Sequence, residues 1–187
     1  MRTKSKKKLE IIKAAEKRFI RHGLRKTTLD EVARDMRIGK STLYHYFDSK
    51  EDLYYQTLDN QFSEYIVEVK SIFSEEQIQH AEILKKYIAL RKSFPQSYKL
   101  LNHLILMSIN DKATQVENEL LSKYHKAEIK IIEDFMKMLF TQAGNEELKK
   151  KTARFSFLLY ATTVLNGFLS KIGVELPDEH DINLLLV

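Results

Sequence analysis

The stretch TLDEVARDMRIGKSTLYHYFDSKEDL, residues 28–53, holds two short helical patterns separated by a turn. Thr28 and Glu31 have the spacing of a capping box, in which each side chain satisfies a free backbone amide at the start of a helix. The pattern breaks at residues 37–39, Arg-Ile-Gly, and resumes as KSTLYHY. Two short helices joined by a turn of about three or four residues are typical of a helix-turn-helix.

A further helix is expected upstream of this stretch. Apolar residues recur at helical steps from Leu9 to Phe19, which predicts an amphipathic helix that ends near Gly23. The basic run that precedes it, residues 2–8, is expected to be a solvated, disordered arm.

Long helices are expected downstream. Asp48 or Ser49 should cap a helix that continues to about Phe73, and Pro95 suits the first turn of a later helix. The chain has few glycines or prolines and no internal repeat. The sequence therefore predicts an all-α protein. Its remaining helices are expected at residues 76–92, 95–109, 112–142 and 146–171, followed by an apolar-ended tail.

The net charge of +5 conceals an asymmetry between the two ends of the chain. Residues 1–50 carry 15 Lys and Arg against 6 Asp and Glu, whereas the rest of the chain carries 16 against 20. A basic segment attached to an acidic one indicates that only the N-terminal part meets a polyanion.

The composition also indicates the compartment. The chain has no cysteine, which excludes a disulfide framework and a thiolate metal site and fits a reducing cytoplasm. The basic N-terminus lacks the apolar region of a signal peptide. The most apolar stretch, residues 100–109, is too short to span a bilayer. We therefore expect a cytoplasmic protein with no membrane partner.

Residues 28–53 resemble the DNA-binding signature of the TetR family of bacterial transcriptional regulators. Many positions match in order, which makes the signal specific. The matching residues are Thr28, Val32, Ala33, Thr42, Leu43, Tyr44, Tyr46, Phe47, Ser49, Lys50, Glu51 and Leu53.

The resemblance implies both an architecture and a function. It implies a helix-turn-helix DNA-binding domain at residues 1–48 and an antiparallel helical effector-binding and dimerisation domain at residues 49–187. It further implies a repressor that binds a palindromic operator in double-stranded DNA as a homodimer and is released by a small hydrophobic effector. No cofactor, metal or catalytic residue is implied.

Three residues depart from the family pattern. Arg37 replaces the usual turn glycine, so either a non-glycine residue tolerates the turn conformation or the turn has another shape. Gly39 replaces the usual serine N-cap, a small loss because glycine is itself an acceptable cap. Met36 replaces a smaller residue and is expected to fill core.

The expected DNA contacts follow from placing the helix that starts at Lys40 in the major groove, where base edges show distinct donors and acceptors. Lys40 can donate to guanine O6 and N7, while Leu43 and Phe47 face back onto the preceding helices. Thr28 and Lys50 begin helices whose free amides suit phosphate. The expected DNA-binding residues are Thr28, Arg37, Lys40, Ser41, Thr42, Tyr44, His45, Tyr46 and Lys50.

The resemblance places the effector and the dimer interface in the later helices. The candidate effector residues are Phe62, Tyr65, Tyr87, Tyr98, Asn102, His103, Ile105, Met107, Tyr124 and Tyr160, of which Asn102 and His103 are polar residues inside the most apolar run. The candidate interface residues are Ile131, Ile132, Phe135, Met136, Leu139, Phe155, Leu158, Leu159, Thr162, Leu165 and Leu169. Plain core packing is the alternative for both sets.

Two other classes of protein compete with this interpretation. An enzyme is disfavoured because the sequence has no Cys nucleophile, no Gly-rich phosphate loop and no HExxH, and its six histidines lack metal-ligand spacing. A helical DNA-binding protein without an effector shares the basic N-terminal part but needs no hollow body. A cavity among the middle helices distinguishes the two.

Overall fold

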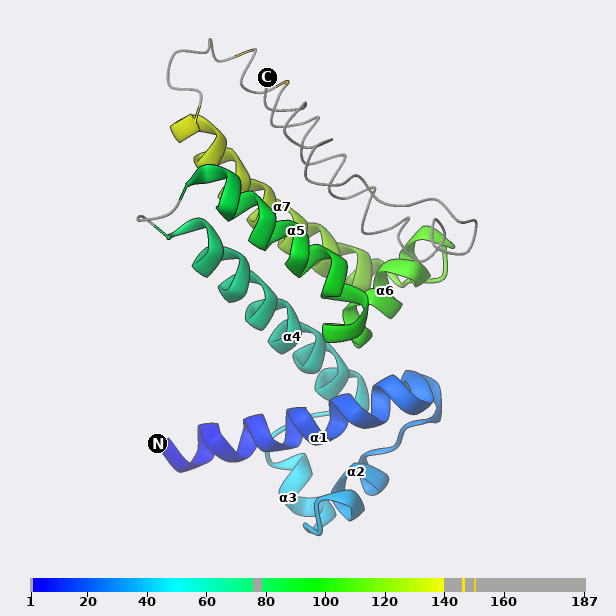
Figure 1. The fold of residues 1–187 in the computed structure, drawn as a ribbon. Coiled ribbons are helices and arrows are strands. Elements are labelled where there is room, and N and C mark those ends of the chain that lie inside the picture. The colour runs from blue at the N-terminus through cyan, green and yellow to red at the C-terminus, as the bar shows by residue number, and fades with distance from the viewer. Residues whose placement is uncertain (1, 76–78, 140–145, 147–149, 151–187) are drawn as a thin grey trace.

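The computed structural model describes residues 2–75, 79–139, 146 and 150, and all regular elements in those residues are helices, as the sequence predicted. The first three helices form a unit that we call the head, and the next four form the body (Figure 1). The helices are α1 (Arg2–Lys26), α2 (Leu29–Asp35), α3 (Lys40–Tyr44), α4 (Lys50–Phe73), α5 (His80–Ser97), α6 (Lys99–Ile109) and α7 (Gln115–Leu139).

The head has a core to which all three of its helices contribute. Phe19 of α1, Val32 of α2 and Leu43 of α3 are each at most 1% exposed. Arg18 of α1 also holds α2, with its Nε atom 2.6 Å from Oδ2 of Asp35. This contact lowers the pKa of the Asp35 carboxyl. Apolar packing and ion pairing together fix α2 and α3 against α1.

Helix α1 differs from the expectation at its start. Residues 2–8, expected to be a disordered arm, belong to the helix. The expected break at Gly23 is confirmed, because Gly23 has φ 72° and ψ 170° between two helical segments. Helical periodicity continues into the basic run because lysine and arginine are good helix formers.

Arg37 takes the left-handed conformation that the turn requires, with φ 54°. The Ile38 N–H donates to the Ala33 carbonyl at 3.0 Å, and the Arg37 N–H donates to the Arg34 carbonyl at 3.0 Å. These two bonds form a Schellman motif, in which glycine usually occupies the position of Arg37. Gly39 is the N-cap of α3, as expected. The non-glycine residue therefore tolerates the usual turn.

We expect Arg37→Gly to raise the free energy of unfolding by about 0.5–1 kcal/mol, because a left-handed side chain costs about 1–2 kcal/mol and the more flexible unfolded chain offsets part of the gain. Arg34→Gly is the matched control, since it places glycine within helix α2 and should destabilise by about 1 kcal/mol. Urea titration of both variants measures the difference. Changes of the same sign would contradict the assignment of strain to Arg37.

The boundary between α5 and α6 differs from the expectation. Pro95, expected to begin a helix, lies inside α5, which continues to Ser97. The break falls at Tyr98, with φ −119° and ψ 57°. Proline has a φ compatible with a helix but removes one hydrogen bond and crowds the preceding turn, and α5 ends two residues after it. The helix expected at residues 146–171 and the tail lie outside the described residues.

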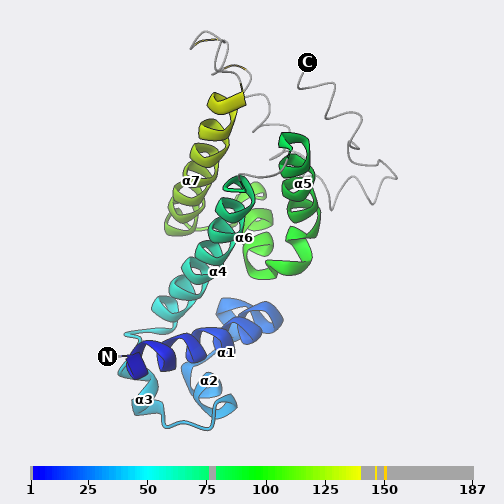
Figure 2. The same cartoon turned by 60° about the vertical axis from the view of Figure 1, so that its left-hand side comes forward.

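Helix α4 connects the head to the body. Its 24 residues extend over about 36 Å, and Figure 2 shows it running from the head into the body, where it lies beside α6 and α7. Ser49 caps it by accepting from the Asp52 N–H at 3.0 Å, which settles the choice between Asp48 and Ser49. The prediction of a helix ending near Phe73 is confirmed.

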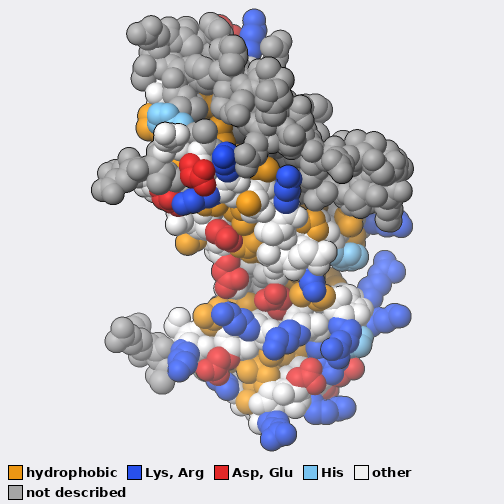
Figure 3. All heavy atoms as spheres, viewed as in Figure 1, with side chains coloured by type: hydrophobic (Ala, Val, Ile, Leu, Met, Phe, Trp, Pro, Cys, Tyr) orange, Lys and Arg blue, Asp and Glu red, His pale blue; other side chains and the backbone are white. Residues whose placement is uncertain are grey.

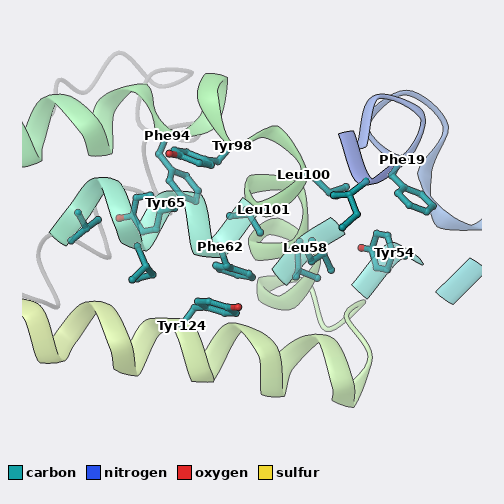
Figure 4. Close-up of a cluster of buried hydrophobic side chains, with 14 of the residues drawn as sticks. Phe19, Tyr54, Leu58, Phe62, Tyr65, Phe94, Tyr98, Leu100, Leu101 and Tyr124 are labelled. Atoms are coloured by element: carbon teal, nitrogen blue, oxygen red, sulfur yellow. The ribbon is translucent and has the colours of Figure 1, made fainter. Parts of the chain in front are cut away.

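One tyrosine of α4 joins three helices. The Tyr54 ring packs edge-on against Phe19 of α1, with centroids 5.1 Å apart, and both rings lie at the head end of the apolar cluster in Figure 4. Its hydroxyl donates to Oε1 of Glu117 in α7 at 3.0 Å. Glu117 also accepts from the Thr114 N–H at 2.7 Å, as the partner in the capping box of α7. The start of α7 is therefore tied to α4 and, through Tyr54, to the head.

None of the helices in the described part of the chain is long and apolar enough to cross a membrane.

Candidate nucleic-acid interface

Helix α3 separates apolar from polar side chains as the sequence predicted. Leu43 is fully buried and Phe47, just beyond the helix, is 1% exposed. Both belong to the buried core, whereas Tyr44 and His45 between them are exposed and Tyr46 packs partly against the core. Among the expected DNA-binding residues, the exposed ones are Thr28, Arg37, Lys40, Ser41, Thr42, Tyr44 and His45, and the half-buried ones are Tyr46 and Lys50. Lys and Arg side chains are spread over the head in Figure 3.

The capping box at the start of α2 is present as predicted. The Thr28 hydroxyl oxygen accepts from the Glu31 N–H at 3.3 Å, and the Thr28 N–H donates to Oε2 of Glu31 at 2.9 Å. Hydrogen bonds from Thr28 lower the pKa of the Glu31 carboxyl. The helix is therefore fixed at the end where its free amides can face a phosphate.

Lys40 has a partner that its local sequence does not indicate. Its Nζ atom lies 2.8 Å from Oδ1 of Asp30 on α2 and 5.8 Å from the centre of the Tyr44 ring. The Asp30 carboxylate raises the pKa of the Lys40 ammonium. Lys40 is therefore a protonated donor at the start of α3, and its ammonium has donors left beyond the one that faces Asp30.

The body contains a cavity of about 230 Å³. Its walls come from α4, α5, α6 and α7, and six of the lining side chains are aromatic or aliphatic while the other six are polar or charged. Phe62 and Tyr124 stack on its wall with ring centroids 4.1 Å apart, as Figure 4 shows. The lining residues are Phe62, Tyr65, Arg91, Phe94, Ile105, Ser108, Asn118, Leu121, Ser122, Tyr124, His125 and Glu128.

The candidate effector residues divide between this cavity and other places. Phe62, Tyr65, Ile105 and Tyr124 line it, whereas the other described candidates do not. Asn102 and His103 are half-buried and exposed, respectively; His103 falls on a different side of α6 from the cavity-lining Ile105, and Asn102, one turn before Ile105, does not reach the cavity. Tyr87 and Tyr98 are buried, Met107 is half-buried, and Tyr160 lies outside the described residues.

A buried ionic network forms one part of the cavity wall. Arg91 Nη1 lies 2.9 Å from Oε1 of Glu128, and the Tyr87 hydroxyl donates to the same oxygen at 2.6 Å. The Tyr65 hydroxyl also donates to it. Burial raises the pKa of both tyrosines, so they remain protonated donors at neutral pH. Burial lowers the pKa of the neighbouring His125.

The candidate dimer residues are described only in part. Ile132, Phe135 and Met136 are buried within the single chain, where Phe135 packs edge-on against Phe73. These three pack in the core of the single chain, and their place in a dimer interface stays a prediction. Ile131 is half-buried, and Leu139 is the last residue of α7. The remaining candidates, Phe155, Leu158, Leu159, Thr162, Leu165 and Leu169, lie outside the described residues.

No group of three or more metal-ligating side chains that could hold an ion occurs among the residues the structure describes.

Comparisons with known proteins agree with this geometry. Residues 11–56 match the family model described as bacterial regulatory proteins, tetR family. The biofilm operon icaADBC HTH-type negative transcriptional regulator IcaR of Staphylococcus epidermidis is 24% identical over 70% of this chain and 76% of its own length. The HTH-type transcriptional regulator QacR of Staphylococcus aureus is 29% identical over 62% of this chain and 65% of its own length.

A solved structure extends the similarity to almost the whole chain. The crystal structure of a transcriptional regulator from Cytophaga hutchinsonii is 29% identical and superposes with a TM-score of 0.67. The superposition covers 96% of this chain and 91% of that one. The similarity therefore includes the body as well as the head.

Proposed function

The chain is a TetR-family transcriptional regulator, and from this premise we propose that it is a repressor that binds a palindromic operator as a homodimer and is released by a small hydrophobic effector. The DNA-binding domain is residues 1–48, and the effector-binding and dimerisation domain is residues 49–187. IcaR, named as a negative regulator, supports repression.

The outward face of α3 is the observation that supports DNA binding. Lys40, Ser41, Thr42 and Tyr44 are exposed on a helix that Leu43 anchors in the head. A single short helix reads only a few base pairs, so two heads on a two-fold axis are needed for a specific site. Selection of duplexes from a random pool by the wild-type protein tests this, because an enriched palindrome is expected.

Lys50→Ala should weaken binding to all duplexes to a similar degree, because Lys50 begins α4 and is proposed to contact phosphate. The slope of log affinity against log salt concentration should fall by about one ion. Glu51→Ala provides a control at the adjacent exposed position. Fluorescence anisotropy at several salt concentrations measures the slope, and an unchanged slope would remove Lys50 from the interface.

Lys40→Ala should change base preference as well as affinity. Loss of a donor to guanine is expected to remove about 1–3 kcal/mol of discrimination at one position of each half-site. Repeating the duplex selection with the variant measures this. An unaltered enriched sequence would show that Lys40 acts only through its charge.

The cavity supports an effector over the alternative of a helical DNA-binding protein without one. Its aromatic and aliphatic walls suit a small hydrophobic molecule. Such a molecule releases DNA if it binds the released state of the body more tightly than the DNA-bound state. Mass spectrometry of the purified protein under native conditions would identify a co-purified molecule, which should then weaken duplex binding when it is added back.

A further inference from the structure

Gln61 of α4 bridges the head and the body through a single buried amide. The residue is 2% exposed. Its Nε2 atom donates to Oε1 of Glu16 in α1 at 2.6 Å, and its Oε1 atom accepts from the Leu101 N–H in α6 at 3.2 Å. Reversing the amide would set donor against donor at Leu101 and acceptor against acceptor at Glu16. Both contacts therefore fix one orientation.

The contact with Leu101 satisfies an amide at the start of α6. The N-cap residue Tyr98 has no side-chain capping bond, and the first N–H of the helix to bond back is that of Asn102, to the Tyr98 carbonyl at 2.9 Å. The amides before it have no partner within the helix. Leu101 is fully buried, so an unmade hydrogen bond there would be costly. Gln61 thus caps α6 from a neighbouring helix.

The contact with Glu16 extends the bridge into the head. Glu16 lies on α1, one turn from the buried Phe19, and is half-buried. Its carboxylate makes the hydrogen bond from Gln61 charge-assisted, and such bonds are stronger than neutral ones. Helices α1 and α6 also contact one another directly, and Figure 4 shows Leu100 of α6 beside Phe19.

The same short helix also lines the cavity. Ile105 and Ser108, which lie one and two turns beyond Leu101 on the same face, are cavity residues. Because α6 has only 11 residues, a shift at Ile105 moves the first turn with it. The first turn is where Gln61 joins α6 to α1.

We infer that Gln61 is a positioning residue that couples the arrangement of the first turn of α6 to DNA occupancy of the head. This rests on the proposed function, because it requires a head that binds DNA. Coupling between two sites acts equally in both directions. DNA binding at the head should therefore change the protection of the Leu101 amide, and no effector is needed to observe it.

The test is amide hydrogen exchange at Leu101 in the full-length protein, with and without a duplex selected by the wild-type protein. DNA should change the exchange rate by about fivefold or more in the wild type, the lower end of usual coupling. In Glu16→Ala the cap on Leu101 remains but the hydrogen-bonded link from Gln61 to α1 is lost, so most of this response should disappear. Glu10→Ala removes a carboxylate from the exposed face of α1 and should leave the response intact.

A double variant separates coupling from simple stabilisation. In Glu16→Gln with Gln61→Glu, the carboxylate introduced on α4 can accept from the amide introduced on α1 and from the Leu101 N–H. The bridge is then rebuilt, with donor and acceptor exchanged only at its contact with α1. The DNA response should then return. The inference would be overturned, and the proposed function would stand, if DNA changed the Leu101 exchange rate equally in the wild type and in Glu16→Ala. The same holds if DNA bound the wild type tightly without changing that rate. Failure of the wild type to select any duplex would overturn the proposed function and this inference with it.

Discussion

Glu128→Ala is expected to lower the free energy of unfolding by about 3–5 kcal/mol, because it removes the carboxylate from a buried ion pair. Arg91 and Glu128 are each 7% exposed, and the hydroxyls of Tyr65 and Tyr87 donate to the same carboxylate. Truncation leaves a buried cation and two buried hydroxyls without that acceptor. Guanidinium titration, followed by circular dichroism, measures the loss.

Two comparisons show whether burial of the pair is the cause. Asp134→Ala removes a carboxylate of α7 that is 57% exposed and pairs with Lys130, and it should change stability little, because exposed pairs contribute little. Replacing both partners, as Arg91→Met with Glu128→Leu, should recover much of the loss, since buried pairs often cost as much as they contribute. Equal effects of Glu128→Ala and Asp134→Ala would contradict this account.

Leu43→Ala is expected to destabilise the protein by about 2–5 kcal/mol, because it leaves a cavity in the core of the head. Leu43 of α3 is fully buried, whereas the neighbouring Tyr44 is 48% exposed. Tyr44→Ala should therefore leave stability nearly unchanged and weaken duplex binding. Urea titration and anisotropy on both variants separate the two roles. Loss of stability in Tyr44→Ala, with unchanged duplex binding, would place Tyr44 in the core instead.

Local patterns explain which parts of the fold were predictable. The capping box of Thr28 and Glu31 and the buried pair of Leu43 and Phe47 involve residues three and four apart, so short-range spacing is sufficient to find them. The prediction for Pro95 is wrong because a proline at a first turn and one inside the last turn look alike in sequence. The break at Tyr98 has no local signal.

The sites were less predictable because their contacts are distant in sequence. Lys40 and Asp30 are ten residues apart, and Arg91 and Glu128 are 37 apart. No helical spacing indicates either pair. Asn102 and His103 stand out in the sequence because they interrupt an apolar run, but only one side of α6 lines the cavity, and Ile105 and Ser108 lie on it. Gln61 resembles any helical glutamine until its neighbours are known.

The position of Tyr54 has a consequence for how the protein folds. Its ring packs against Phe19 of α1, and its hydroxyl donates to Glu117, whose side chain belongs to the capping box of α7. Both oxygens of the Glu117 carboxylate are therefore engaged only when α4 has docked on α7. Contacts of this kind make unfolding cooperative across units that could otherwise melt separately. Head and body should thus lose their structure in one transition.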